Sequence, residues 1–152
     1  RAIEALEQMV GDAAADAYSR WQAAQSLVTI APGNQRAIEA LEHAAADAST
    51  RWRAAESLRT IAPGNQRAIE ALEQMVGDAA ADASTGRRAA ESLGKILSTP
   101  QHYAGVVSAL KGCLRNKVYQ NDFDRFETSY KLLWNCAENL PYPDFYQAWH
   151  NP

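Results

Sequence analysis

A repeated block of sequence places the strongest constraint on what this chain can fold into. The segment Arg-Ala-Ile-Glu-Ala-Leu-Glu begins at Arg1 and returns at Arg36 and Arg67, so its copies start 35 and then 31 residues apart. Residues 1–17 are identical to residues 67–83. Self-similarity with a period of about 20–50 residues is typical of proteins in which each repeat buries its apolar face against the next. We therefore expect three stacked units.

Each copy has the pattern of two helices joined by a loop. The first helix opens at an asparagine N-cap that follows Pro-Gly, at Asn34 and at Asn65. Apolar residues recur at helical spacing in the first helix of the first copy (Ile3, Leu6, Met9, Val10) and in its second helix (Ala23, Ala24, Leu27, Ile30). No segment alternates with period two. The predicted fold is all-α: a short α-solenoid of helical pairs, with about nine helices in the whole chain.

The repeats predict a division of the chain after residue 97. We expect three helical pairs at 1–35, 36–66 and 67–97, followed by a helical capping domain at 98–152. The second copy lacks four residues after Glu42, where the other copies carry Gln-Met-Val-Gly. Because four residues are about one helical turn, this pair should have a shorter first helix or a tighter loop.

The capping domain contains less alanine and more aromatic residues than the repeats. Thr99-Pro100 indicates the start of a helix that runs to about Arg115, and Pro143 opens a last short helix. Between them, large residues recur at spacings of three and four, the pattern of a buried stripe (Phe123, Phe126, Tyr130, Leu133, Ala137). We expect Phe126 and Tyr130 to pack against the helix that carries Val106 and Leu110.

The three copies differ mainly along one stripe of the second helix. On a wheel of about 100° per residue, the variable positions fall on one side and the unchanged apolar positions on the other. The polar residues of the first helix, Arg1, Glu4 and Glu7, return unchanged in both other copies. Two interpretations are open. The stripe is either a surface selected for diversity or an exposed surface that has drifted; drift would be expected to change both helices.

The residue types in this stripe favour binding. Tyrosine and tryptophan are the residues that form interface hot spots, and basic residues outnumber acidic ones there. A tryptophan at these positions is alternatively part of the core between repeats. We expect the stripe to form one continuous concave face that binds a protein or peptide, with its Tyr and Trp largely exposed. The candidate partner-binding residues are Tyr18, Trp21, Gln22, Gln25, Val28, Trp52, Arg53, Glu56, Arg59, Arg87, Arg88, Glu91 and Lys95.

Two stretches resemble known families. The second-helix segments 51–61 and 87–96, with Arg, Ala-Ala, Leu and Ile in a fixed order, resemble the HEAT-like repeats first noted in phycobilisome lyases. The segments 118–127, 134–136 and 142–150 resemble the C-terminal helical domain of cyanobacterial NACHT-type (STAND) NTPases, which are signalling ATPases related to innate-immune receptors. This resemblance implies that the chain is the sensor end of a protein with an upstream NTPase domain. The resemblance of the helical pairs to HEAT-like repeats implies that the second helix of each pair lines the concave surface.

Two other functions stay open. HEAT-like solenoids can bind nucleic acid, and Arg51-Trp52-Arg53 interleaves groups that contact phosphate with one that stacks on bases. Against this, the net charge is −3, and Glu56 and Glu91 lie in the same stripe. The resemblance to the lyases implies a bilin-lyase-like function, although the sequence offers no candidate acid or nucleophile.

Composition excludes several classes of protein. No apolar run approaches the roughly 20 residues that cross a bilayer, so no membrane association is expected. Two cysteines, Cys113 and Cys136, are too few for a disulfide framework, which favours a cytoplasmic protein with reduced thiols. No motif has metal-ligand, cofactor-binding or catalytic spacing, so we expect the chain itself not to be an enzyme. Since Arg1 already lies within a repeat, we expect the chain to be part of a longer protein.

Overall fold

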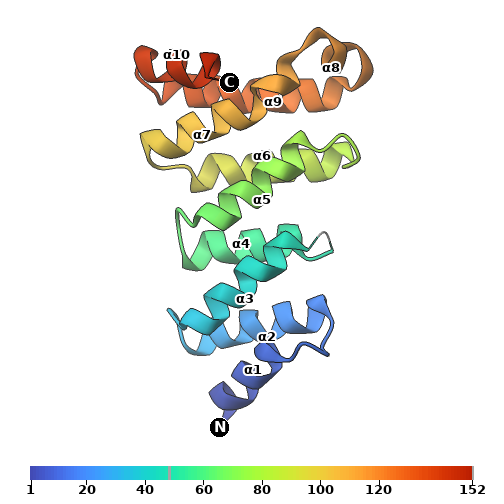
Figure 1. Cartoon of the computed structure of the whole chain (residues 1–152), viewed down its shortest axis with the longest axis vertical. Coiled ribbons are helices and arrows are strands. Elements are labelled where there is room, and N and C mark those ends of the chain that lie inside the picture. The colour runs from blue at the N-terminus through green and yellow to red at the C-terminus, as the bar shows by residue number, and fades with distance from the viewer. Residues whose placement is uncertain (48, 152) are drawn as a thin grey trace. The chain divides into compact units, whose positions relative to one another are not determined.

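The fold is all-α, as predicted (Figure 1). The computed structural model describes residues 1–47 and 49–151, and in these residues it contains ten α-helices, one short 3-10 helix and no strand. The chain divides into two compact units, residues 1–71 and 72–152, and helix α5 (Gln66–Gly77) runs across the boundary between them. Within the described residues, no helix has both the length and the apolar character needed to cross a membrane.

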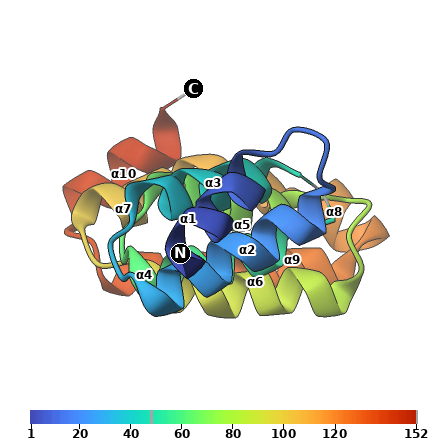
Figure 2. The ribbon, with the colours of Figure 1, turned by 90° about the horizontal axis from the view of Figure 1, so that it is seen from below.

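The first unit is a stack of helical pairs. It contains α1 (Ala2–Gly11), α2 (Ala17–Ile30), α3 (Gln35–Ala46) and α4 (Arg51–Ile61). Each helix packs on the next one along the chain, while α1 also contacts α3 and α2 contacts α4. The first helices of the pairs therefore form one layer and the second helices form the other (Figures 1 and 2).

Small side chains fill the contact between the two layers. The buried residues of α2 and α4 lie at matching positions of the two copies (Ala23, Ala24 and Leu27; Ala54, Ala55 and Leu58). Helix α3 faces them with the same kinds of residue (Ala37, Leu41, Ala44, Ala45). The predicted apolar stripe of α2 is thus confirmed except for Ile30, which is 54% exposed at the end of the helix. The predicted stripe of α1 is not buried: Ile3 and Met9 are 38% and 49% exposed, and the helix has no buried residue.

An asparagine at the start of a first helix ties that helix to the preceding pair. Oδ1 of Asn34 accepts a hydrogen bond from the Ala37 amide (3.1 Å), which caps α3, while its Nδ2 donates to Oε1 of Glu7 on α1 (3.0 Å). The same arrangement recurs one pair later, where Nδ2 of Asn65 donates to Oε1 of Glu42 (2.8 Å). The predicted N-caps are therefore also contacts between repeats.

The four residues missing from the second copy do not shorten its first helix. Helices α3 and α5 both have 12 residues, whereas α4 has 11 where α2 has 14. Helix α4 starts late, after Thr50, whose buried hydroxyl donates to the carbonyl oxygen of Ala44 (2.8 Å). Of the two predicted alternatives, the tighter connection, here between α3 and α4, is correct. The remaining missing residues shorten the start of α4, the second helix of this pair.

The second unit is organised around α9. It contains the end of α5, then α6 (Ala83–Ile96), α7 (Pro100–Leu110), the 3-10 helix η1 (Lys111–Leu114), α8 (Asn116–Asn121), α9 (Phe123–Glu138) and α10 (Tyr142–His150). Helix α9 packs on α6, α7, η1 and α8, while α10 packs mainly on α7 (Figure 1). Nζ of Lys111 donates to the Trp149 carbonyl at the end of α10 (2.9 Å), which fixes that helix in place.

The buried face of α9 shares only Leu133 with the predicted stripe. Its buried residues are Ser129, Leu132, Leu133 and Cys136. Phe123 and Tyr130 are 53% and 49% exposed, and Phe126 is half-buried. The expectation that Phe126 and Tyr130 pack against Val106 and Leu110 is therefore wrong. Small side chains let α9 approach its neighbours closely, whereas a row of rings would hold the helices apart and leave gaps, which dense protein interiors avoid.

This orientation of α9 predicts that two substitutions on the same helix lower the free energy of unfolding by very different amounts. Leu133→Ala removes a fully buried side chain and should lower the free energy of unfolding by about 2–5 kcal/mol. Tyr130→Ala removes a half-exposed ring and should cost less than about 1 kcal/mol. Urea denaturation followed by circular dichroism measures both. A larger loss for Tyr130→Ala would restore the aromatic stripe as the core of this unit.

Candidate partner-binding surfaces

In the first unit, two aromatic rings and a guanidinium group form a cluster across two repeats. Tyr18 and Trp21 on α2 lie with their ring centroids 5.4 Å apart. The guanidinium of Arg53, from α4, lies over both rings, 5.2 Å from the first centroid and 5.5 Å from the second. Tyr18 is 47% exposed, and Trp21 is half-buried. The contact between α2 and α4 therefore brings together three of the predicted binding residues.

Other predicted residues of this unit take part in contacts between or within the same helices. The Ser57 hydroxyl on α4 donates to Oε1 of Gln25 on α2, and Nε of Arg59 donates to Oε1 of Glu56 (3.0 Å). Gln22 is exposed. Val28 is only 5% exposed, so its side chain belongs to the core and is not presented to a partner. Trp21 and Trp52 are both half-buried rather than largely exposed as expected.

The Arg51-Trp52-Arg53 motif does not act as one basic patch. Nε of Arg51 donates to the Ala45 carbonyl (3.2 Å) and its Nη2 donates to the Ala46 carbonyl (3.1 Å), at the end of α3. A positive group at a helix C-terminus is favoured by the helix dipole. Arg51 thus joins α4 to the end of α3 within its own helical pair, whereas Arg53 lies over the rings of Tyr18 and Trp21 in the preceding pair.

The predicted residues of the third repeat lie in the second unit. Arg87, Arg88, Glu91 and Lys95 are all exposed on α6, and Nζ of Lys95 pairs with Glu91 at 2.9 Å. Arg87 and Glu91 line a groove of about 340 Å³ together with polar residues of α9 (Asp124, Glu127, Thr128, Lys131, Asn135). That these residues continue the face of α2 and α4 stays a prediction, because they belong to a different unit.

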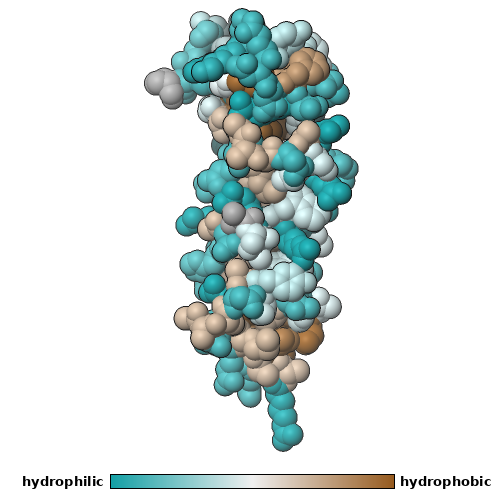
Figure 3. Space-filling view, turned by 90° about the vertical axis from the view of Figure 1, so that its right-hand side faces the viewer, coloured by the Kyte–Doolittle hydropathy of each residue, from teal (hydrophilic) through white to brown (hydrophobic). Residues whose placement is uncertain are grey.

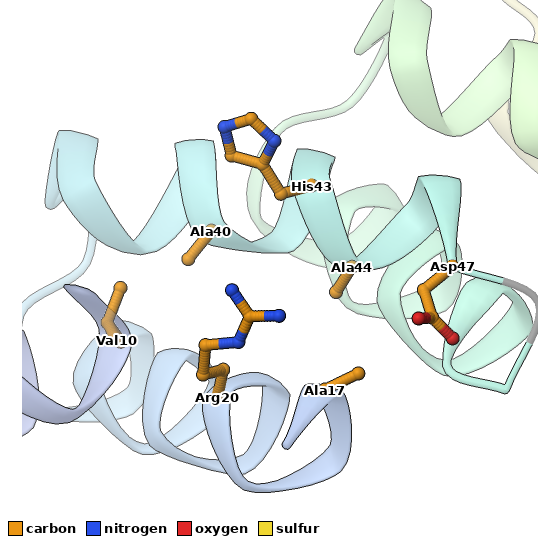
Figure 4. A pocket seen from close by; sticks show the side chains of 7 residues that line it. All are labelled: Val10, Ala17, Arg20, Ala40, His43, Ala44 and Asp47. Carbon is orange, nitrogen blue, oxygen red and sulfur yellow. The ribbon is translucent and has the colours of Figure 1, made fainter. Parts of the chain in front are cut away.

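A small pocket lies between α2 and α3. Arg20 reaches into it from α2, below Ala40 and Ala44, and Asp47 lines it at the end of α3 (Figure 4). Hydrogen bonds from Ser49, and to a lesser extent the charges of Arg20 and Arg51, hold the pKa of the Asp47 carboxyl below its ordinary value. The pocket measures about 70 Å³, well below the roughly 300–1,000 Å³ of ligand pockets.

The second unit carries a continuous row of aromatic rings, which we call the aromatic face (Tyr119, Phe123, Phe126, Tyr130, Trp134, Tyr142, Tyr146). Along α9, the rings of Phe123, Phe126, Tyr130 and Trp134 are stacked one after another, with neighbouring centroids 6.3–6.4 Å apart. Tyr119 contacts the first two of them edge-on. Trp134 is 59% exposed, and its Nε1 donates to Oε1 of Glu138 (2.9 Å).

The aromatic face continues onto α10 around an apolar pocket. This pocket measures about 420 Å³, and its lining contains no Asp, Glu, Lys or Arg (Leu114, Tyr130, Leu133, Trp134, Ala137, Tyr142, Phe145, Tyr146, Trp149, His150). Tyr142 is 74% exposed. The imidazole of His150 lies against the ring of Tyr146, with the centroids 4.1 Å apart. On the side of the molecule seen in Figure 3, hydrophilic and hydrophobic residues are interspersed, so hydropathy alone does not single out one binding patch there.

The sequence-based prediction missed this surface because it counted these rings as core. One signal in the sequence could have identified it. Ser129, Leu132, Leu133 and Cys136 form a second stripe on α9 at helical spacing, made of smaller residues. Where two stripes compete, the smaller residues allow the closer helix contact.

Residues 122–150 match a family model described as "NACHT C-terminal Cysteine and Histidine-containing". The matched segment begins at the N-cap of α9 and ends with α10, so it includes most of the aromatic face. It contains one cysteine, Cys136, and one histidine, His150. Comparison of the chain with curated proteins and with solved structures gives no match.

The cysteine and the histidine of this segment have different surroundings. Cys136 is fully buried, and burial, followed by the negative charge of Glu73, raises the pKa of its thiol to about 12. His150 is exposed at the rim of the apolar pocket. Among the described residues, no three His, Cys, Asp or Glu side chains are grouped so that they could hold a metal ion. Cys136 therefore serves as a small apolar residue of the core.

The thiol of Cys136 should resist modification while the protein is folded. In a Cys113→Ala variant at pH 8, DTNB should leave Cys136 unmodified and should label it once urea unfolds the chain. Because the folded pKa lies above the unfolded value, this thiol stabilises the fold fully below about pH 8.5, and the contribution is lost as pH rises towards 12. Labelling of the folded protein within minutes would show that Cys136 is accessible.

Proposed function

We propose that the chain is a partner-binding C-terminal region of a NACHT-type signalling or defence NTPase, acting inside the cell with an NTPase domain upstream. The match of residues 122–150 to the NACHT C-terminal family model supports the association with NACHT proteins. The HEAT-like character of the helical pairs and the cyanobacterial kinship rest on the sequence patterns of segments 51–61 and 87–96 and of the C-terminal stretches. The partner in this proposal is a protein or peptide.

The cluster of Tyr18, Trp21 and Arg53 is the observation that carries this proposal for the repeats. Tyrosine, tryptophan and arginine are the residues enriched at the centres of protein interfaces. The guanidinium is already held over the rings, so less side-chain freedom is lost when a partner binds. An arginine stacked in this way still offers planar N–H donors to a carbonyl or carboxylate.

The contacts of the basic residues favour a protein partner over a nucleic acid. Arg51 is bonded to the end of α3, Arg59 to Glu56, and Lys95 to Glu91. Nucleic-acid binding draws most of its affinity from uncompensated positive charge along the phosphate backbone. A bilin-lyase-like function rests on the resemblance of the repeats, and the pocket within the repeats, between α2 and α3, is too small for a tetrapyrrole.

Replacing Tyr18 tests the proposed surface. With a partner captured by the intact parent protein from its source cells, Tyr18→Ala should raise Kd about thirtyfold, a loss of roughly 2 kcal/mol, and leave the thermal midpoint nearly unchanged. Ile30→Ala, an exposed position on the same helix outside the stripe, should change neither. Isothermal titration calorimetry provides the affinities.

Trp52→Ala and a DNA titration complete this test. Since Trp52 is half-buried, its replacement should lower both affinity and stability. The wild-type chain should show no salt-dependent binding to random single- or double-stranded DNA. If Tyr18→Ala left the partner affinity unchanged, the face formed by α2 and α4 would not be the binding site. Tight, salt-dependent binding to DNA would favour the nucleic-acid function.

A further inference from the structure

The aromatic face exposes as much apolar ring surface as the largest patch of a typical monomer, or more. Six of its rings are between 49% and 74% exposed (Tyr119, Phe123, Tyr130, Trp134, Tyr142, Tyr146). Since a fully buried aromatic side chain removes about 150–250 Å² from water, these six leave roughly 500–800 Å² accessible. The largest apolar patch on a typical monomer is about 300–600 Å². Surfaces above that size are usually contact surfaces.

This ring surface is continuous. Ring contacts of 5.1–6.4 Å connect Tyr119 through to Trp134. Tyr130 and Trp134 then share the apolar pocket with Tyr142 and Tyr146 of α10, whose own centroids lie 6.0 Å apart. All of these residues belong to one compact unit. A partner could therefore contact the row and the pocket at the same time.

The charged residues beside the row of rings on α9, Glu127 and Lys131, are complementary to those of a second copy of the same surface. Nζ of Lys131 pairs with Oε1 of Glu127 one turn earlier on α9 (3.1 Å), and both side chains are solvent-accessible at 72% and 45%. In a contact with two-fold symmetry, residue i meets residue j while j meets i. With the two α9 helices antiparallel, Glu127 of each copy would face Lys131 of the other. Phe123 of each copy would face the Trp134 end of the row.

We infer that the aromatic face joins two copies of this chain in a two-fold symmetric dimer. The accessible ring area per copy comes close to the roughly 800 Å² per partner that stable interfaces bury. The apolar pocket of one copy then receives a ring from the other. This inference concerns a different surface from the proposed partner-binding face of α2 and α4, and does not depend on it.

Sedimentation velocity of the 152-residue chain over about 1–500 µM, which includes the weak, micromolar end of the affinities of interfaces of this size, tests the dimer. The wild-type chain should pass from monomer to dimer within this range. Trp134→Ser and Tyr130→Ser, both at exposed positions, should each raise the dimer Kd at least tenfold. Circular dichroism melting curves check that the variants stay folded. Tyr18→Ser, which removes an equally exposed ring from the other unit, should leave the dimer Kd unchanged.

A charge exchange tests the two-fold geometry. Glu127→Lys alone should weaken the dimer, and the double variant Glu127→Lys with Lys131→Glu should restore it, because the exchanged pair is again complementary across the axis. A chain that stays monomeric, a dimer unaffected by Trp134→Ser and Tyr130→Ser, or open-ended assembly beyond the dimer would each overturn the inference. So would an apolar small molecule or a foreign helix that binds this face of a persistent monomer.

Discussion

Close contact between helices through small side chains governs both units of this protein. In the first unit, pairs of alanines followed by a leucine lie between the layers (Ala23, Ala24, Leu27; Ala54, Ala55, Leu58). In the second unit, Ser129 and Cys136 play the same part on α9, and Ala148 on α10. Narrow seams of this kind have no room for aromatic rings. The large side chains are therefore left at the edges of the seams or in water, where they are available for binding.

The sequence predicted the starts of the first helices α3 and α5 well because two independent signals agreed there. Helical periodicity and the asparagine N-caps after Pro-Gly both placed α3 correctly and placed the start of α5. Periodicity failed on α9, where two stripes share helical spacing. Hydrophobicity favoured the ring stripe, but side-chain volume decided in favour of a second stripe that shares only Leu133 with it (Ser129, Leu132, Leu133, Cys136). The late start of α4 depends on a hydrogen bond from Thr50 back to the end of α3, which helical periodicity does not reveal.

The contacts of Glu7 change how the variation among repeats is interpreted. An unchanged polar face on the first helices argued that the variable stripe of the second helices was selected. In the structure, however, Glu7 bonds to Asn34 and pairs with Arg36 (3.5 Å), and Glu42 bonds to Asn65. Part of that unchanged face is therefore needed to hold the repeats together. The case for a binding surface on α2 and α4 now depends on its residue types and on the arginine–aromatic cluster.

The orientation of α9 underlies both the corrected core and the aromatic face, and hydroxyl-radical footprinting measures it directly. At a concentration low enough to keep the chain monomeric, Tyr130, Trp134 and Tyr142 should be oxidised rapidly, while Leu132 and Leu133 on the same helix should be protected. Protection of Tyr130 and Trp134 in the monomer, together with oxidation of Leu132 and Leu133, would show that α9 buries its rings. That result would contradict this account of the second unit.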